Sequence, residues 1–526
     1  MKTVGRLLAV TTLLALATGL LFGAGQEEPA AAEERLVISL IPFTNQGTTL
    51  APDSWVELYL EETYNVDLQP WYDSDSYDAD ARAVRIAAGD IPDYLGVWGG
   101  HYDEWIDQGI VRPLSQELIM EHMPNWMQIV DDYLGDNKWN RCVFDGVNYR
   151  IPTIFSGATT GMVTGIRGDW LRAVGYEPEP VPGKDFFRGP DSLEEIEDIF
   201  LKFRNDDPDG NGEKDTYAYM IWKNSPNLGD EAFPNVFGSF GVRMKTWDVK
   251  DGEGYYSMVD PNYREALKYI NSWWEMEIIH PDTVAFVRPD ILRAMANDEF
   301  GAWSDWDGWH ATRTGGPWGA FFENYPDSDI AVVITPEGPT GGRGGYFRPA
   351  ASSRLAFGKD ASDEVVIKVM QMLEDINLDI DKFARAHFGG DEGETWEVNA
   401  DGYRIGIPGT GVLKDPATAT ELGVRIFTFG AQIVPPIDMA YFAPERHALM
   451  SYLQEHQTVS PGTGIRPAWT DDERALVANV GTVEQEFGWK AITGRIDIDA
   501  EWDGYVQAMM DAGLDALLAA AAKQGM

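Results

Sequence analysis

Strand-like and helix-like segments alternate along residues 36–98, and this alternation constrains the fold more than any other feature. The chain reads, in order, strand, helix, strand, helix and strand at residues 36–41, 54–62, 66–70, 80–88 and 94–98. Such an order folds into a parallel sheet with helices on both faces. Ligands of these sheets bind beyond the carboxyl ends of the strands. The loops 42–48 and 98–101 are therefore expected to border a binding site.

The chain is 526 residues long. This exceeds what one hydrophobic core supports, so two or three domains are expected. A second α/β stretch begins at Ile166, and the Gly-rich segments 153–165 and 336–345 read as crossings between two lobes. The predicted lobes are residues 36–158 with about 337–425, and residues 159–336 with about 426–526. The predicted class is α/β.

Residues 1–25 have the pattern of a cleaved signal peptide. Lys2 and Arg6 precede an apolar run at 7–21, which is too short to span a bilayer. The segment 21–24 has the shape of a lipoprotein box but lacks its cysteine. We expect an exported, soluble protein, periplasmic or extracellular, without a lipid anchor at this position.

The net charge of −44 and the cysteine content exclude several classes of protein. Repulsion from phosphates excludes nucleic acid as a partner, and an anionic membrane surface is disfavoured for the same reason. Cys142 is the only cysteine, so no intramolecular disulfide forms. We expect this thiol to be buried rather than catalytic.

Residues 207–215, Asp-Pro-Asp-Gly-Asn-Gly-Glu-Lys-Asp, place oxygen atoms at the spacing of an EF-hand loop. The predicted ligands are Asp207, Asp209, Asn211, the backbone carbonyl of Glu213, and Asp215. Oxygens in this order suit Ca²⁺. Position 12 of the loop is Ala218 instead of a bidentate Glu, and no paired loop is visible, so we expect a structural ion rather than a regulatory one. An Asp- and Gly-rich turn without metal is the alternative.

Aromatic residues make up 12% of the chain and include 19 Trp. Indole faces stack on the C–H faces of sugar rings, and the ring hydroxyls pair with acids and amides. Abundant Trp and acid, with few His and one Cys, is typical of a carbohydrate site. Trp-rich cores and protein interfaces are the alternatives.

The segment 303–310 contains the main candidates for such a site. Trp303, Trp306 and Trp309 are spaced three residues apart, with Asp305 among them. Three indoles with acids between them would line a sugar trough. Alternatively, the start of a helix packs these Trp residues into its lobe.

Further candidates lie at predicted strand ends and crossings. They are Trp98 and His101, Asn45 and Gln46, Phe155 and Ser156, Tyr346 and Arg348, and Trp222. An arginine grips a carboxylate bidentately, so Arg348 would suit a uronate sugar. The alternatives are a buried Trp, ordinary turn residues and a surface ion pair.

Seven motifs resemble one family across nearly the whole mature chain. They are the segments 87–93, 109–114, 122–125, 145–152, 166–171, 207–215 and 505–515. Together they are similar to extracellular solute-binding proteins of family 1, the sugar-binding subunits of ABC importers, in the LipO-like and alginate-binding-like branch. The segment 300–306 is also similar to the aromatic segment that maltodextrin-type binders place in their cleft.

This resemblance implies a two-lobed periplasmic-binding-protein fold of type 2 with a hinge between the lobes. It implies a monomer that closes on an oligosaccharide, docks on the membrane permease of an ABC importer, and has no catalytic residues. It also implies that the loop 207–215 binds structural calcium, although Thr216 stands where the branch often has a closing Glu.

Two other classes of protein remain open from the residues alone. An exported glycoside hydrolase or polysaccharide lyase would share the richness in Trp and acid, and needs a pair of carboxylates. The chain has no H-E-x-x-H, G-x-S-x-G or P-loop motif to support an enzyme. A peptide-binding protein of the same two-lobed fold is the second alternative.

Overall fold

The computed structural model describes most of the chain after the leader. The described residues are 35–42, 50–72, 79–96, 102–154, 162–221, 228, 232–286, 288–306, 321–322, 324–344, 351–414, 416–424, 435–441, 443–457, 467 and 469–524. Among them, no helix is long and apolar enough to cross a membrane.

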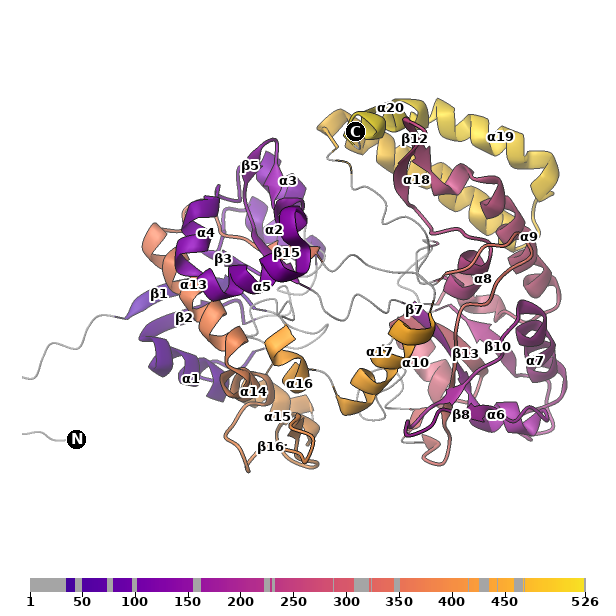
Figure 1. Cartoon of the computed structure of the whole chain (residues 1–526), viewed down its shortest axis with the longest axis horizontal. Coiled ribbons are helices and arrows are strands. Elements are labelled where there is room, and N and C mark those ends of the chain that lie inside the picture. Colours follow the sequence, from indigo (N-terminus) through magenta and orange to yellow (C-terminus); the bar gives the residue numbers. More distant parts are fainter. Residues whose placement is uncertain are drawn as a thin grey trace, which may run out of the picture.

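The described elements form two lobes, which Figure 1 shows side by side. The first lobe contains indigo and orange segments, from residues 35–154 and 351–441, and the second contains magenta and yellow segments, from residues 162–344 and 467–524. Each lobe therefore combines two stretches that are far apart in the sequence. This arrangement confirms the predicted α/β fold with two lobes.

The sheet of the first lobe has the predicted parallel order. Its strands β1 (Leu36–Ile41), β2 (Val66–Pro70) and β3 (Tyr94–Leu95) lie in the order β2-β1-β3. The helices between them are α1 (Trp55–Tyr64) and α2 (Ala79–Ala87). β3 is shorter than the predicted 94–98, because Gly96 already lies outside the strand.

Helices complete the first lobe, together with short strands and turns. They are α3 (Tyr102–Asp107), α4 (Gln116–His122), α5 (Pro124–Leu134), η2 (Gly135–Trp139), β4 (Val143–Phe144), β5 (Val147–Asn148), β6 (Ile151–Ile154), β15 (Ala351–Leu355), α13 (Asp363–Leu378), α14 (Ile380–Phe388), β16 (Trp396–Val398), β17 (Arg404–Gly406), η6 (Gly411–Leu413), α15 (Pro416–Leu422), η7 (Pro435–Ile437) and α16 (Asp438–Tyr441).

Two strands of the first lobe mark where the chain crosses to the second lobe. β6 pairs antiparallel with β15, with Ile154 opposite Ala351. β6 ends just before residues 155–161, and β15 begins just after residues 345–350. The last residue before the first crossing, Ile154, thus lies beside the first residue after the second crossing, Ala351.

The second lobe is built on a six-stranded mixed sheet. Its order is β10-β13-β7-β14-β9-β8. The strands are β7 (Met162–Arg167), β8 (Glu179–Pro180), β9 (Phe187–Arg188), β10 (Tyr217–Met220), β13 (Phe300–Trp306) and β14 (Ile330–Val333). The other elements are α6 (Gly168–Ala173), α7 (Leu193–Asn205), α8 (Pro234–Ser239), β11 (Trp247–Lys250), β12 (Glu253–Tyr256), η4 (Ser257–Val259), α9 (Pro261–Glu275), η5 (Pro281–Val284), α10 (Arg288–Ala296), α18 (Asp471–Ile492), α19 (Ile498–Asp511) and α20 (Leu514–Gln524). The helix α17 (Pro444–His456) contacts both lobes.

Separate hydrophobic cores stabilise the two lobes. In the first lobe, Trp126 packs with residues of β1 and α13. In the second, Trp273 on α9 packs with α7, α18 and α19. Burial of such large aromatic side chains is the main favourable term in folding, so each lobe has the apolar interior of an independent domain.

Packing moves two predicted lobe boundaries by several residues. Residues 337–344 contact α8 of the second lobe, where Gly338 lies against the backbone of Ser239 and Gly342 against that of Gly241. Residues 435–441 belong to the first lobe, because Ile437 and Ala440 are in its core. Glycine at 338 and 342 permits this close backbone approach, where the sequence predicted only a crossing between the lobes.

Candidate functional site

Strand directions bring several predicted loops to one edge of the second-lobe sheet. β10, β13 and β14 all end at this edge, which we name the carboxyl edge. β7 runs antiparallel to β13 and β14, and its first residue Met162 lies opposite Trp306. The first crossing and the segments after β10, β13 and β14 therefore meet at the carboxyl edge. In the first lobe, the parallel strands β1, β2 and β3 likewise end together.

Most of the residues that the sequence nominated fall outside the described residues. These are Asn45, Gln46, Trp98, His101, Phe155, Ser156, Trp222, Trp309, Tyr346 and Arg348. The strands that precede several of them are described, and they end at the two carboxyl edges. Their assignment to a binding site stays a prediction.

Trp303 does not line an open trough in this structure. The segment 300–306 is the strand β13, not the start of a helix. The side chain of Trp303 is 1% exposed and packs edge-on to Phe300, with ring centroids 5.7 Å apart, in a core cluster that includes Met220 and Phe321. Core packing, the alternative weighed for this residue, is what the structure supports. Asp305 and Trp306 are the last two residues of β13, and their backbones pair with Val163 and Met162.

A buried network of polar side chains holds the carboxyl edge together. The Thr164 hydroxyl donates to Asn235 Oδ1 and lies 2.6 Å from the hydroxyl of Ser304. Asn235 Nδ2 donates to Thr335 Oγ1 at 3.0 Å, which joins α8 to the end of β14. Buried polar groups that satisfy one another in this way fix a single arrangement. The network therefore holds the strand ends at this edge in fixed positions.

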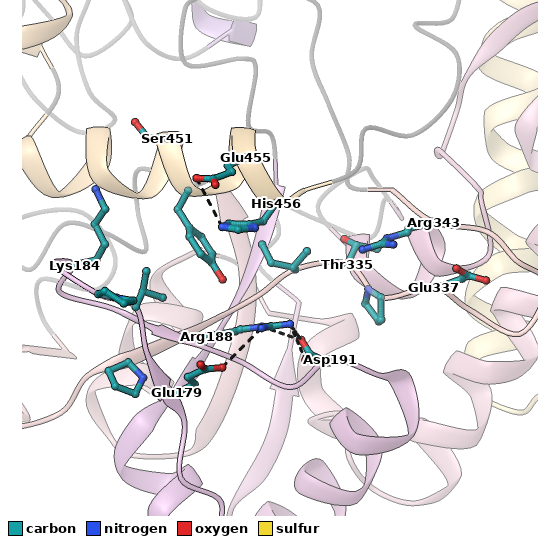
Figure 2. A pocket seen from close by; sticks show the side chains of 16 residues that line it. Glu179, Lys184, Arg188, Asp191, Thr335, Glu337, Arg343, Ser451, Glu455 and His456 are labelled. Carbon is teal, nitrogen blue, oxygen red and sulfur yellow. Dashed lines mark hydrogen bonds and ion pairs between the residues drawn. The ribbon is translucent and has the colours of Figure 1, made fainter.

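A cavity of about 680 Å³ opens at this edge, between the β8–β9 hairpin, the end of β14 and the helix α17. We name it the α17 cavity. Figure 2 shows Arg188, Asp191 and Thr335 on the side of the sheet, with His456 approaching from α17. Its volume falls within the range of roughly 300–1,000 Å³ that is typical of small-molecule sites. It is the candidate binding cavity of the described part of the chain.

Charged and aromatic side chains line the α17 cavity. Arg188 Nη2 donates to Asp191 Oδ2 at 2.8 Å, and its Nη1 lies 3.8 Å from Glu179 Oε2. The hydrogen bond to Asp191 raises the pKa of Arg188. On α17, the rings of Tyr452 and His456 are 4.5 Å apart. These residues were not predicted from the sequence, although aromatic residues four positions apart lie on one face of a helix and could have indicated a binding surface.

The helix α17 contacts both lobes. Its His447 packs against Tyr403 of the first lobe, with ring centroids 5.1 Å apart, and lies 3.0 Å from the carbonyl of Asp438. Beyond its last turn, Gln457 donates to Thr335 Oγ1 at 2.8 Å, and Leu453 joins a core cluster of the second lobe. Figure 1 shows α17 between the two lobes. A ligand in the α17 cavity would therefore lie beside a helix that contacts both lobes.

The predicted calcium loop lies at the opposite edge of the same sheet, because it precedes β10. Asn211 Nδ2 is 2.7 Å from Asp209 Oδ2 and 3.2 Å from Asp215 Oδ1, and the backbone NH of Gly212 donates to Asp207 Oδ2 at 2.9 Å. The carboxylates of Asp209 and Asp215 thus accept from one amide nitrogen, and that of Asp207 accepts from the backbone of the turn. Burial, the hydrogen bond with Asp207 and the charge of Asp215 raise the pKa of Asp209 to about 6.

The side chains of this loop are rich in oxygen, which suits a hard cation such as Ca²⁺, because this ion prefers six or more oxygen ligands. Positive φ angles at Asp207, Gly210 and Gly212 give the loop its tight curvature. Thr216, which stands at the position of the closing Glu, donates its hydroxyl to the carbonyl of Phe203 at 2.7 Å and so points toward α7. Among the described residues, no group of His, Cys, Asp and Glu side chains has the geometry of a complete metal site.

The helix before this loop, α7, begins at an N-cap serine. The Ser192 hydroxyl accepts from the backbone NH of Glu195 at 3.1 Å. The carboxylate of Glu195 accepts from the NH of Asp191 at 3.0 Å instead of returning to Ser192, so the capping box is incomplete. The N-cap bond alone marks the start of the helix.

Comparison with known proteins gives matches to sugar-binding subunits of transporters. No protein-family model matches the chain. Over 250 residues, 45% of the chain, it is 25% identical to the fructooligosaccharide ABC transporter substrate-binding protein FusA of Streptococcus pneumoniae, of which the match covers 44%. Over 117 residues, 22% of the chain, it is 26% identical to lipoprotein LipO of Bacillus subtilis, of which the match covers 21%. The matches thus span less than half the length of these curated relatives.

Solved structures match over nearly the whole chain. FusA of S. pneumoniae in complex with kestose superposes with a TM-score of 0.69 at 18% identity, covering 93% of this chain and 98% of FusA. The chain has the two-lobed solute-binding-protein fold. An EF-hand mutant of FusA in complex with fructo-nystose gives a TM-score of 0.68 at 17% identity, with coverage of 93% and 98%. The alginate-binding protein AlgQ2 without calcium ion gives 0.64 at 17% identity, with the same coverage. These matches confirm the resemblance to extracellular solute-binding proteins that the motifs predicted.

Proposed function

We propose that this chain is the extracytoplasmic substrate-binding subunit of an ABC importer and that it captures an oligosaccharide. The two-lobed fold and the match to a fructooligosaccharide-binding subunit support this proposal. The observation that carries it is the α17 cavity at the carboxyl edge, next to a helix that contacts both lobes. A ligand held there contacts the second lobe and α17, the helix that also packs on the first lobe.

Capture occurs by closure of the lobes over the sugar. A ligand that contacts both lobes stabilises the closed arrangement and so shifts the population toward it. The crossings at residues 155–161 and 345–350 flank the β6–β15 pair and act as the hinge. The closed protein, acting as a monomer outside the cytoplasm, then docks on the membrane subunits of the importer.

The remaining ligand contacts come from segments that follow the carboxyl edges. Trp306, Trp309, Asp305 and Trp222 extend from the second lobe, and Asn45, Gln46, Trp98 and His101 from the first. Phe155, Ser156, Tyr346 and Arg348 lie in the crossings. Indoles and polar groups from both lobes then surround one sugar chain.

The loop 207–215 binds a structural Ca²⁺ through Asp207, Asp209, Asn211, Asp215 and the backbone carbonyl of Glu213. The closeness of the Asp209 and Asp215 carboxylates to the side chain of Asn211 supports this role. The loop lies at the sheet edge opposite the α17 cavity, so the ion stabilises the lobe and makes no contact with the sugar.

Calorimetry with product analysis tests the function against its alternatives. A panel of neutral and uronic oligosaccharides is titrated into the mature protein, and each sugar is then analysed by chromatography. We expect binding with recovery of intact sugar. Shortened or unsaturated products indicate a hydrolase or lyase instead. Tight binding of peptides with no binding of sugars indicates a peptide carrier of the same fold.

A further inference from the structure

An aromatic wall on α17 closes one side of the α17 cavity. Tyr452 and His456 lie one helical turn apart, with 51° between their rings. Tyr452 also packs edge-on to Phe186, with ring centroids 5.3 Å apart, which fixes its orientation. Burial raises the pKa of Tyr452, so its phenol stays protonated at neutral pH. Fixed rings of this kind present apolar faces with polar groups at their edges.

A polar floor lies on the other side of the cavity. Arg188 Nε and Nη2 donate to Asp191 Oδ1 at 3.1 Å and 2.8 Å, and Figure 2 shows this pair across the cavity from His456. An arginine–carboxylate pair offers both N–H donors and oxygen acceptors. A sugar hydroxyl can use both at once, because it is a donor and an acceptor.

The charge of the lining selects against an anionic ligand. Three lining residues are Lys or Arg and four are Asp or Glu. The lining therefore has no excess of positive charge. The guanidinium of Arg188 is already held between Asp191 and Glu179. The carboxylate of a uronate ring would meet four acidic groups and three basic ones here, and desolvating a charge that is incompletely paired is costly.

We propose that the α17 cavity is the subsite for a neutral ring of the captured saccharide. Tyr452 and His456 stack on the C–H face of this ring, and the Tyr452 hydroxyl and the Arg188–Asp191 pair bind its hydroxyl groups. The inference rests on the proposed function and narrows it: the ligand is a neutral oligosaccharide, not an oligouronate. It also assigns the choice of sugar to residues other than Arg348, the residue that the sequence suggested would bind a uronate carboxylate.

Calorimetry on matched variants tests this subsite. Neutral fructo-, malto- and manno-oligosaccharides and size-matched oligogalacturonates are titrated into the wild-type protein, His456→Ala and Tyr452→Phe. The controls His122→Ala and Tyr133→Phe change the same residue types on α4 and α5 of the first lobe, outside the cavity. Circular dichroism and the melting temperature show that each variant is folded.

We expect a neutral oligosaccharide to bind more tightly than any oligogalacturonate. His456→Ala lowers its affinity roughly ten-fold, on the scale of aromatic stacking in other systems. Tyr452→Phe lowers it about two- to ten-fold through the lost hydroxyl, and the control variants stay within about two-fold of the wild type. Tighter binding of the oligogalacturonates, or unchanged neutral-sugar affinity in both folded cavity variants, overturns the subsite. Absence of binding to every sugar overturns the proposed function itself.

Discussion

Arg474, near the start of α18, donates to the carboxylate of Asp107 at the end of α3, and this ion pair joins the second lobe to the first. A second bond, from Arg474 Nη1 to the carbonyl of Trp469 at 2.6 Å, orients the guanidinium. The two side chains are 24% and 27% exposed. Ion pairs with this much solvent contact contribute about 0–1 kcal/mol. The pair therefore biases the arrangement of the lobes without locking it.

Reversing one charge of this pair should drive the lobes apart. Asp107→Arg places two positive charges in contact, and we expect a larger radius of gyration of the ligand-free protein in small-angle scattering. The exchange Asp107→Arg with Arg474→Asp should restore the wild-type value. Asp360→Arg, at an exposed position of the first lobe, is the matched control. A radius that stays unchanged in Asp107→Arg would show that the pair does not hold the lobes.

Alanine substitutions at two tryptophans of β13 should affect different properties, stability at Trp303 and sugar affinity at Trp306. Trp303→Ala removes a fully buried indole, which costs about 3–5 kcal/mol of unfolding free energy. Trp306→Ala acts at the carboxyl edge, and we expect an intact fold with sugar affinity reduced ten-fold or more, on a stacking scale of roughly 1–3 kcal/mol. Melting temperatures and calorimetry measure both effects. A stable Trp303→Ala variant with lost affinity would restore the trough that the sequence suggested.

The sequence predicted local elements well where one short pattern determines them. β1 and β2 have the predicted bounds, because β1 is an almost continuous apolar run that ends at Pro42, and β2 alternates apolar and polar residues after Asn65. The Trp residues at 303 and 306 were ambiguous, since their spacing of three also fits a helix. Pairing of β13 with β10 and β7 decided in favour of a strand, and those partners lie more than 80 and 130 residues earlier.

The candidate cavity could not be predicted in the same way. Its walls come from residues near 180–191, 334–343 and 451–456. Only the order of strands in the sheet brings these segments together, and that order depends on contacts between distant parts of the chain. The sequence located the carboxyl edges from strand directions, but it gave no sign that α17 returns to cover one of them.

Removal of calcium should lower stability and leave affinity unchanged. A bound ion offsets the repulsion among Asp207, Asp209 and Asp215, and an ion at 100 times its dissociation constant adds about 2.7 kcal/mol. We expect a chelator, or Asp209→Asn with Asp215→Asn, to lower the melting temperature, with sugar affinity within about two-fold. Asp198→Asn, at an exposed position of α7, is the control. Loss of affinity at full stability would place the ion in the sugar site instead.

Stability should fall when the pH drops below the ordinary range of a histidine. Burial lowers the pKa of His280, although Asp282 and Glu299 oppose this shift. Its Nδ1 accepts from the backbone NH of Asp282 at 3.1 Å, and its ring lies 4.5 Å from that of Tyr217.

Below a pH of about 6.5, the unfolded chain binds a proton that the folded chain resists, so unfolding becomes easier. Urea midpoints at pH 7.5 and 5.5 measure this loss. We expect a smaller loss in His280→Gln than in the wild type, while His122→Gln behaves as the wild type. Equal losses of stability in all three proteins would contradict the assignment of this pH dependence to His280.

Small-angle scattering with and without a bound oligosaccharide tests the central claim, which is that two hinged lobes close on one sugar. With the sugar that gives the largest calorimetric signal, the account predicts a smaller radius of gyration and a shorter maximum dimension. The double variant His456→Ala with Trp306→Ala should require much more sugar to reach the same compaction. A wild-type particle that binds the sugar at saturation and keeps its ligand-free dimensions would contradict the claim that the two lobes close on the sugar.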